Sequence, residues 1–287
     1  MDELLRQSVP LAIAIFLVTA MLSLGLDMTV KQVIQPLRNR RLVIMSLLTS
    51  ALVVPLIAIV LTRVIPMEQA LATGLILYAL AVGTEGGPKF VQLVHGNTPF
   101  AFGLLGVQLT VTVIFLPLVI NVAIPDAQVA LGEVAAKLLL LVALPIGVGM
   151  LVNARLANLA ERINPAVHRL SVIFLALLFI LLIYVNIDAI VSLQLTALLA
   201  GLLLFIAGYG AGYAAGGPLV ENRKALAIMT FARNGSISML LAGQVFTDEP
   251  QVLVMVTLMA AGSVVFAVLV VVVDRLLNRQ RGLTTAI

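Results

Sequence analysis

The chain has 287 residues, of which 62% are hydrophobic and 10% charged, with no cysteine and a formal net charge of +4. Soluble domains carry about a quarter charged residues, so this composition excludes an ordinary soluble fold, and the missing cysteines exclude disulfides and thiolate catalysis. In lipid, backbone N–H and C=O groups must form their hydrogen bonds within helices or a closed β-barrel. The apolar runs here are about 20 residues long and do not alternate between apolar and polar residues, which indicates helices. The sequence therefore predicts an all-α polytopic membrane protein.

Nine apolar segments follow one another along the chain, and residues 1–287 are expected to form a single membrane domain. The segments lie at 8–26, 42–64, 69–96, 98–123, 130–152, 169–192, 194–217, 223–246 and 251–273. The opening stretch MDELLRQSVP has no basic leader, and no A-x-A cleavage pattern follows the first segment. We therefore expect that segment to be a membrane span and not a signal peptide.

The basic residues between the segments fall mostly in alternate loops. One set of loops contains Lys31, Arg38, Arg40, Arg41, Arg155, Arg162, Arg169, Arg223, Lys224, Arg275, Arg279 and Arg281. The other set, with the N-terminal residues, contains Arg6 and Arg63 beside Glu68, Asp126, Asp188, Asp248 and Glu249. Because basic loops stay in the cytoplasm, the pattern predicts a multi-pass protein of the cell (inner) membrane with its N-terminus outside and its C-terminus inside. The membrane topology thus explains the net positive charge of the chain. The expected partner is the lipid bilayer and not nucleic acid.

Helix-breaking residues interrupt the third segment at "EGGPKF", residues 85–90. Pro88 lacks a backbone donor and clashes with the preceding turn of a helix, so it should end one helix and begin another. Gly86 and Gly87 before it can turn the chain. The third span is therefore expected to consist of two half-helices.

The eighth segment has a similar interruption at "FARNGSIS", residues 231–238. Asn234 and Ser236 are poor in a helix interior and good at a helix start. Broken helices at membrane depth are tolerated only where they are buried in protein or line a cavity, and two of them point to the central site of a transporter. Since the third segment runs inward and the eighth outward, the two halves should be inverted.

Charged residues accompany both breaks: Glu85 and Lys89 at the first, and Arg233 at the second. Their charges sum to about one net positive charge, to which the positive dipole ends of two half-helices add, and a bound carboxylate would relieve this charge. Arg233 could hold such an anion bidentately. Two structural alternatives remain open at this stage: Glu85 could pair with Arg233, or with Lys89 four residues away.

Other polar residues offer weaker signals. Gln92, Gln108 and Thr110 could line the cavity or form hydrogen bonds between helices. The glycines at 208, 212 and 216, spaced four apart, favour close helix packing. No metal site and no cofactor is expected from these residues.

Several ordered stretches resemble the bile acid:sodium symporter family over nearly the whole chain. They are MLSLGLDMTVKQVIQPLRNRRLV, the Pro55 that follows it, GTEGGPKFVQLVHGN and NRKALAIMTFARNGSISMLLA. The resemblance implies two inverted repeats with a crossed pair of broken helices, here without the first helix of the usual ten: repeat 1 at about 8–123 and repeat 2 at about 130–277. It also implies a core of spans three, four, five, seven, eight and nine, with spans one, two and six as a panel.

The residues at the family's sodium sites differ in this chain. Gly87 and Pro88 occupy the positions of a Ser-Asn pair, and Met229 and Arg233 stand where the family has Glu and Gln, while Asn234 matches. Further sodium ligands would fall on Ser50, Ala101 and Leu105. A hard cation requires several converging oxygens, so sodium binding is not expected.

The sequence thus predicts a secondary transporter that moves small organic anions, carboxylates above all, by alternating access. Lys89 and Arg233 are expected to replace sodium as the cations of the site, with a proton as a candidate coupled ion. The alternative is a sodium-coupled symporter of organic anions or bile acids. A membrane-embedded enzyme is a third reading, for which no nucleophile with a base and no carboxylate pair is visible.

Overall fold

The structure, a computed structural model, describes residues 2–34, 38–125, 129–185 and 194–280. Asp126, Asp188 and Arg281, which entered the loop-charge prediction, lie outside these residues. Over the described ranges the chain is helical, and its only β-type pairing is one isolated bridge. The predicted all-α fold is therefore confirmed.

The helices follow the apolar segments in order. They are α1 (Asp2–Asp27), α2 (Val30–Ile34), α3 (Arg40–Leu47), the π-helical η2 (Leu48–Val53), α4 (Val54–Val64), α5 (Gln69–Leu80), α6 (Gly87–Leu93), α7 (Thr98–Ala123), α8 (Leu131–Leu138), the π-helical η4 (Leu139–Ala143), α9 (Leu144–Arg155), α10 (Ala157–Val185), α12 (Leu195–Ala215), α13 (Val220–Phe231), α14 (Gly235–Val245) and α15 (Pro250–Gln280). Each π-helical turn directly precedes a helix whose second residue is a proline, Pro55 or Pro145. Proline cannot donate to the preceding turn, which is a common cause of such local widening.

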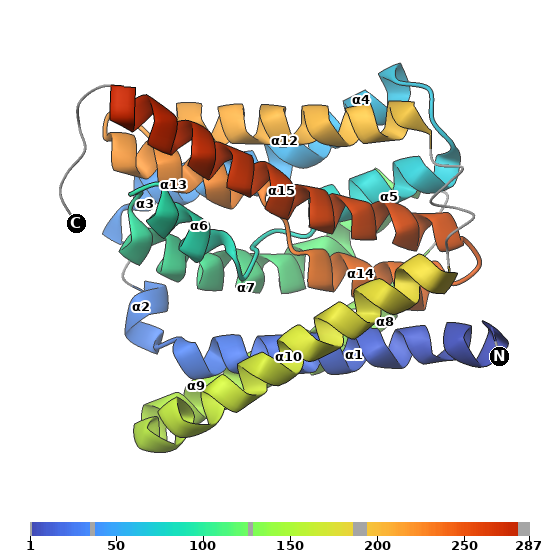
Figure 1. Ribbon diagram of the computed structural model, residues 1–287, viewed down its shortest axis with the longest axis horizontal. Helices are drawn as coiled ribbons and strands as arrows, with labels where there is room; N and C mark the ends of the chain where they lie inside the picture. Colours follow the sequence, from blue (N-terminus) through green and yellow to red (C-terminus); the bar gives the residue numbers. More distant parts are fainter. Residues whose placement is uncertain (1, 35–37, 126–128, 186–193, 281–287) are drawn as a thin grey trace.

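Seven helical stretches in the described residues are long and apolar enough to cross a membrane. They are Ser8–Asp27, Arg40–Val64, Thr98–Ala123, Leu131–Arg155, Ala157–Tyr184, Leu195–Ala215 and Pro250–Leu277. Two further spans are each made of two short helices, α5 with α6 and α13 with α14. The arrangement is that of a multi-pass membrane protein. In Figure 1, α1 begins at one end of the bundle and α15 ends at the other.

The helices pack in two groups. In one, α1 lies against both α9 and α10, and α9 also contacts α10. The other contains α4, α5, α12, α13 and α15, with α6 packed on α7 and α13. Figure 1 shows α1, α9 and α10 together along one side of the molecule. This packing joins the first, fifth and sixth spans, whereas the resemblance had implied a panel of the first, second and sixth.

The glycine series of α12 lies where the helix approaches α13. A side chain at Gly212 would collide with backbone atoms of Leu226 and Ala227, and one at Gly216 with the backbone of Arg223. Gly210, on another face of α12, has open space around it. The predicted close packing is therefore confirmed, and it holds α13 firmly behind the second break.

Candidate functional site

The two interrupted spans meet at their breaks. Residues 81–86 separate α5 from α6, and residues 232–234 separate α13 from α14. The two extended segments run antiparallel, joined by a bridge between Val82 and Arg233. The backbone N–H of Asn234 also donates to the carbonyl of Ala81 at 2.9 Å. Both predicted breaks are thus present, and they cross each other.

Side chains satisfy the backbone groups that these breaks leave free. Thr112 accepts a hydrogen bond from the N–H of Val82 at 3.0 Å and donates to its carbonyl at 2.7 Å. Asn234 caps α14 by accepting from the N–H of Ile237 at 2.9 Å, and its amide donates to the carbonyl of Gly83 at 2.8 Å. These bonds fix the geometry of the crossing, as buried irregular backbone requires.

The sequence of the first break fits this local geometry. Gly87 begins α6 and Pro88 follows at its second position, where a backbone donor is not needed. A Cβ at Gly87 would lie 2.6 Å from the sulfur of Met229 on α13, so any larger residue there would force this methionine side chain to move. Gly83 has a φ of +89°, which glycine adopts without strain.

A cavity of about 900 Å³ lies between this crossing and the helices α1 and α10. Its polar and charged lining comprises Ser23, Asp27, Gln32, Thr84, Glu85, Lys89, His168, Ser171, Arg233, Ser236 and Ser263. Its apolar walls include Phe16 of α1, Phe179 of α10, Met239 of α14 and Val264 of α15. The volume lies within the range of small-molecule sites, about 300–1,000 Å³.

Arg233 forms part of the wall of this cavity and is 2% exposed. Its Nη1 donates to the carbonyl of Ser50 at 2.6 Å. Its Nε and Nη2 are shielded from solvent in this conformation and have no hydrogen-bond partner among the described residues. These two atoms form one edge of the guanidinium, the edge that binds a carboxylate with two parallel hydrogen bonds. A buried cation left half-satisfied is costly, so this edge favours an anionic ligand.

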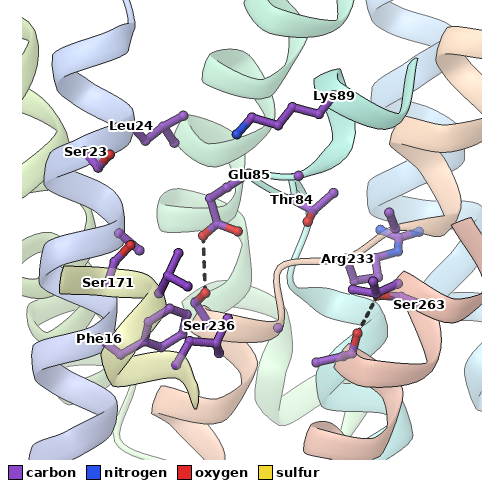
Figure 2. A pocket seen from close by; sticks show the side chains of 18 of the residues that line it. Phe16, Ser23, Leu24, Thr84, Glu85, Lys89, Ser171, Arg233, Ser236 and Ser263 are labelled. Carbon is purple, nitrogen blue, oxygen red and sulfur yellow. Dashed lines mark hydrogen bonds between the residues drawn. The ribbon is translucent and has the colours of Figure 1, made fainter. Parts of the chain in front are cut away.

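Glu85 projects from the first break into the same cavity, and Figure 2 shows its carboxylate beside Ser236. Its Oε1 accepts hydrogen bonds from the amide of Asn234 and the hydroxyl of Ser236, both at 3.3 Å. Lys89, on α6, lines the cavity and is exposed. Within the described ranges, Glu85 forms an ion pair with neither Lys89 nor Arg233. The ion pairs there join Lys137 to Glu133 and Lys224 to Asp274.

A second polar cluster lies behind Arg233, away from the cavity. The amide nitrogen of Gln108 donates to the hydroxyl of Ser50 at 3.2 Å and to the carbonyl of Met229 at 3.3 Å. Ser50 in turn contacts the hydroxyl of Thr230 at 3.4 Å. The carbonyl oxygen of Gln108 has no partner among the described residues. Arg233 reaches this cluster through the carbonyl of Ser50.

Five of the residues singled out from the sequence share the cavity wall: Glu85, Gly86, Lys89, Arg233 and Ser236. Gly87, Pro88 and Asn234 build the crossing without lining the cavity. Gln108 is fully buried in the cluster behind it. Gln92 on α6 and Thr110 on α7 are exposed and lie outside the lining, with the hydroxyl of Thr110 donating to the carbonyl of Gly106.

The sequence pattern missed the contribution of α1 and α10. Asp27 closes α1 and also accepts a hydrogen bond from Asn164 of α10, while Ser23 donates to the same asparagine. His168, one residue before the predicted sixth segment at 169–192, lies within α10 and lines the cavity. The only available signal was the presence of polar residues near the ends of these two spans.

Two interrupted helices that cross beside a ligand-sized cavity in a multi-pass bundle are an arrangement found in membrane transporters. The chain belongs to the sodium bile acid symporter family, whose model matches residues 14–193. The family resemblance seen in the sequence is thereby confirmed, and the family is one of transporters.

Two curated relatives are similar to the chain. The mouse P3 protein is 25% identical over 198 residues, which cover 67% of this chain and 41% of the mouse protein. The human P3 protein is 27% identical over 177 residues, which cover 59% of this chain and 37% of the human protein. The matched region thus spans less than half the length of either relative.

Proposed function

We propose that this protein is a secondary transporter that moves small organic anions, carboxylates above all, across the membrane by alternating access. The observation that carries the proposal is the guanidinium of Arg233, buried in the cavity wall with its Nε and Nη2 edge unoccupied. A carboxylate placed there would accept two charge-assisted hydrogen bonds. The apolar walls would then hold the rest of the anion, which accounts for a cavity of about 900 Å³.

The dipoles of two half-helices support an anion in the same place. The first turns of α6 and α14 begin at Gly87 and Gly235, on either side of the crossing. Helix N-termini carry partial positive charge and free N–H groups. Lys89, exposed where it lines the cavity, adds a cation that can attract an anion from water.

The packing supports a particular division of the moving parts. We propose that α1, α9 and α10 form the panel, and that the crossing and the helices around it form the core. The cavity lies between these two groups, so rocking one against the other would change its access. The lining runs from Phe16 to Asp27 along α1, toward the end of the bundle where the basic loops gather. By the charge asymmetry of the loops, that end is cytoplasmic and the N-terminus is outside.

We further propose that transport does not require sodium. Arg233 stands at a position where the family resemblance implies a sodium ligand, and it contributes a fixed positive charge. Ala101 and Leu105, at two other such positions, are fully buried apolar residues that cannot coordinate a cation.

A sodium-coupled symporter is the second candidate, and one observation favours it. The cluster of Ser50, Gln108 and Thr230 contains a buried amide oxygen without a partner, as a cation site would. The adjacent guanidinium of Arg233 opposes a cation there, since like charges at this range repel strongly in a low-dielectric interior.

The test uses purified protein and four probes: acetate, succinate, benzoate and cholate. Binding is measured by thermal shift and titration calorimetry in sodium-free potassium buffer and in sodium buffer, followed by uptake into proteoliposomes. We expect at least one probe to bind and to be taken up equally well in both buffers. Binding of none of the four anions would contradict the proposed function, while binding only with sodium would favour the second candidate.

A further inference from the structure

Glu85, at the crossing of the two broken spans, is a feature of the cavity wall that anion binding alone does not explain. An anion held by Arg233 would share a cavity with a second negative charge, the carboxylate of Glu85. Two like charges in a water-poor site repel strongly. A site built only to attract an anion would not place a glutamate on its wall.

The surroundings of Glu85 leave its charge without a close cation. Its described hydrogen-bond donors, Asn234 and Ser236, are both neutral. The charged and titratable groups that face the cavity from other elements are Asp27 on α1, Lys89 on α6, His168 on α10 and Arg233 in the second break. The lining contributed by α7, α14 and α15 is uncharged. Among the described residues, no cavity-lining cation lies within ion-pair distance of Glu85.

The charges of the enclosed part of the site balance only if a proton accompanies the anion. Because Asp27, Lys89 and His168 are exposed, the charges of the less exposed part of the site are the buried Arg233 and the half-buried Glu85, which sum to zero when the carrier is empty and Glu85 is ionised. An anion alone would leave one net negative charge at membrane depth, which is costly. An anion together with a proton on Glu85 restores neutrality, so both the empty and the loaded carrier can change conformation.

We propose, on the basis of the proposed function, that Glu85 takes up one proton with each anion, so that transport is anion–proton symport. The carboxylate of Glu85 accepts a proton from the solution that loads the anion and returns it to the solution that receives the anion. Once protonated, it no longer repels the anion and can donate a hydrogen bond to it, while still accepting from Asn234. By thermodynamic linkage, protonation and anion binding strengthen each other by the same factor.

The experiment measures proton uptake on binding, with purified full-length protein and the tightest-binding anion among acetate, succinate, benzoate and cholate. Calorimetric titrations in two buffers of different ionisation enthalpy give the number of protons taken up per anion. We expect close to one proton for the wild-type protein, and affinity that rises about tenfold per unit of falling pH while Glu85 is ionised in the empty protein. The E85Q variant should bind the anion without proton uptake and with affinity independent of pH.

Two further arms distinguish the possible failures. E221Q makes the same chemical change at an exposed glutamate of α13 and should retain proton uptake. If the wild-type protein binds none of the anions, the proposed function itself fails. If it binds an anion without taking up a proton, or if E85Q still takes one up, the proton role of Glu85 is overturned while anion transport stands. A loss of proton uptake in D27N, with E85Q unchanged, would likewise overturn it. Even if E85Q does not fold, the wild-type titration decides whether a proton accompanies the anion, and D27N tests Asp27 as the acceptor.

Discussion

Replacing Arg233 with methionine separates a ligand-binding arginine from a structural one, because the two roles predict opposite changes in stability. Methionine has a similar length and no charge. The guanidinium makes a single described hydrogen bond, to the carbonyl of Ser50, and its remaining edge is unpaired. The substitution therefore removes one hydrogen bond from the protein but removes both bonds from a bound carboxylate.

The magnitudes follow from these bonds. A hydrogen bond to a charged group contributes about 1.5–3 kcal/mol, so loss of two from the bound anion amounts to about 3–6 kcal/mol. Affinity should then fall by about 10²- to 10⁴-fold. In the empty protein, loss of the bond to Ser50 costs about 1–3 kcal/mol, whereas removal of a buried charge that has no ion-pair partner gains several kcal/mol. The melting temperature of R233M without ligand should equal or exceed that of the wild-type protein.

The assay combines calorimetric binding with thermal unfolding of the purified protein in a single detergent. R233K serves as the matched control, since it keeps the positive charge but lacks the planar edge that holds a carboxylate. It should bind more weakly than the wild-type protein and should not gain stability. Wild-type affinity in R233M would contradict the site assignment, and a marked fall in its melting temperature would show that Arg233 is a structural residue.

Three further predictions follow from the same contacts. G212L should lower the melting temperature, since its side chain would press on the backbone of α13 at a cost of about 1–3 kcal/mol or more, whereas G210A on the open face of the same helix should leave it unchanged or slightly raised. N234A should lower both the melting temperature and uptake, because it removes the N-cap of α14 and the hydrogen bond to the carbonyl of Gly83. The N-cap alone contributes about 1 kcal/mol to stability. An unchanged melting curve would show that these bonds do not hold the crossing. K89Q should weaken anion binding only severalfold. Because the lysine is exposed, the difference in affinity from the wild-type protein should vanish at high salt. A salt-independent loss of affinity of 100-fold or more would place Lys89 in direct contact with the anion.

The breaks of the third and eighth spans could be predicted from sequence because their causes are local. A Gly-Gly-Pro stretch cannot continue a helix. Asn234 caps the helix that follows it through a bond to a residue three positions later, which does not depend on tertiary packing. The same holds for the seven long apolar helices in the described residues, which depend only on hydropathy and length. Features that a few consecutive residues determine were therefore visible without the structure.

The opposite wall of the cavity could not be predicted, because it depends on tertiary packing. Phe16 and Phe179 have the hydropathy of lipid-facing residues, yet both line the cavity. Hydropathy likewise does not reveal which face of a helix turns inward, so Gln108 and Thr110 looked alike although one is fully buried and the other exposed. The grouping of the fifth span with α1 and α10 follows from contacts far apart in the sequence.

The most direct test of the anion site is an experimental structure of the protein with a heavy-atom-labelled carboxylate such as 4-bromobenzoate. The account predicts an anomalous bromine signal among the apolar walls of the cavity, with the carboxylate about 2.7–2.9 Å from Nε and Nη2 of Arg233. Arg233 paired with Glu85 while the bromine lies outside the cavity would contradict it.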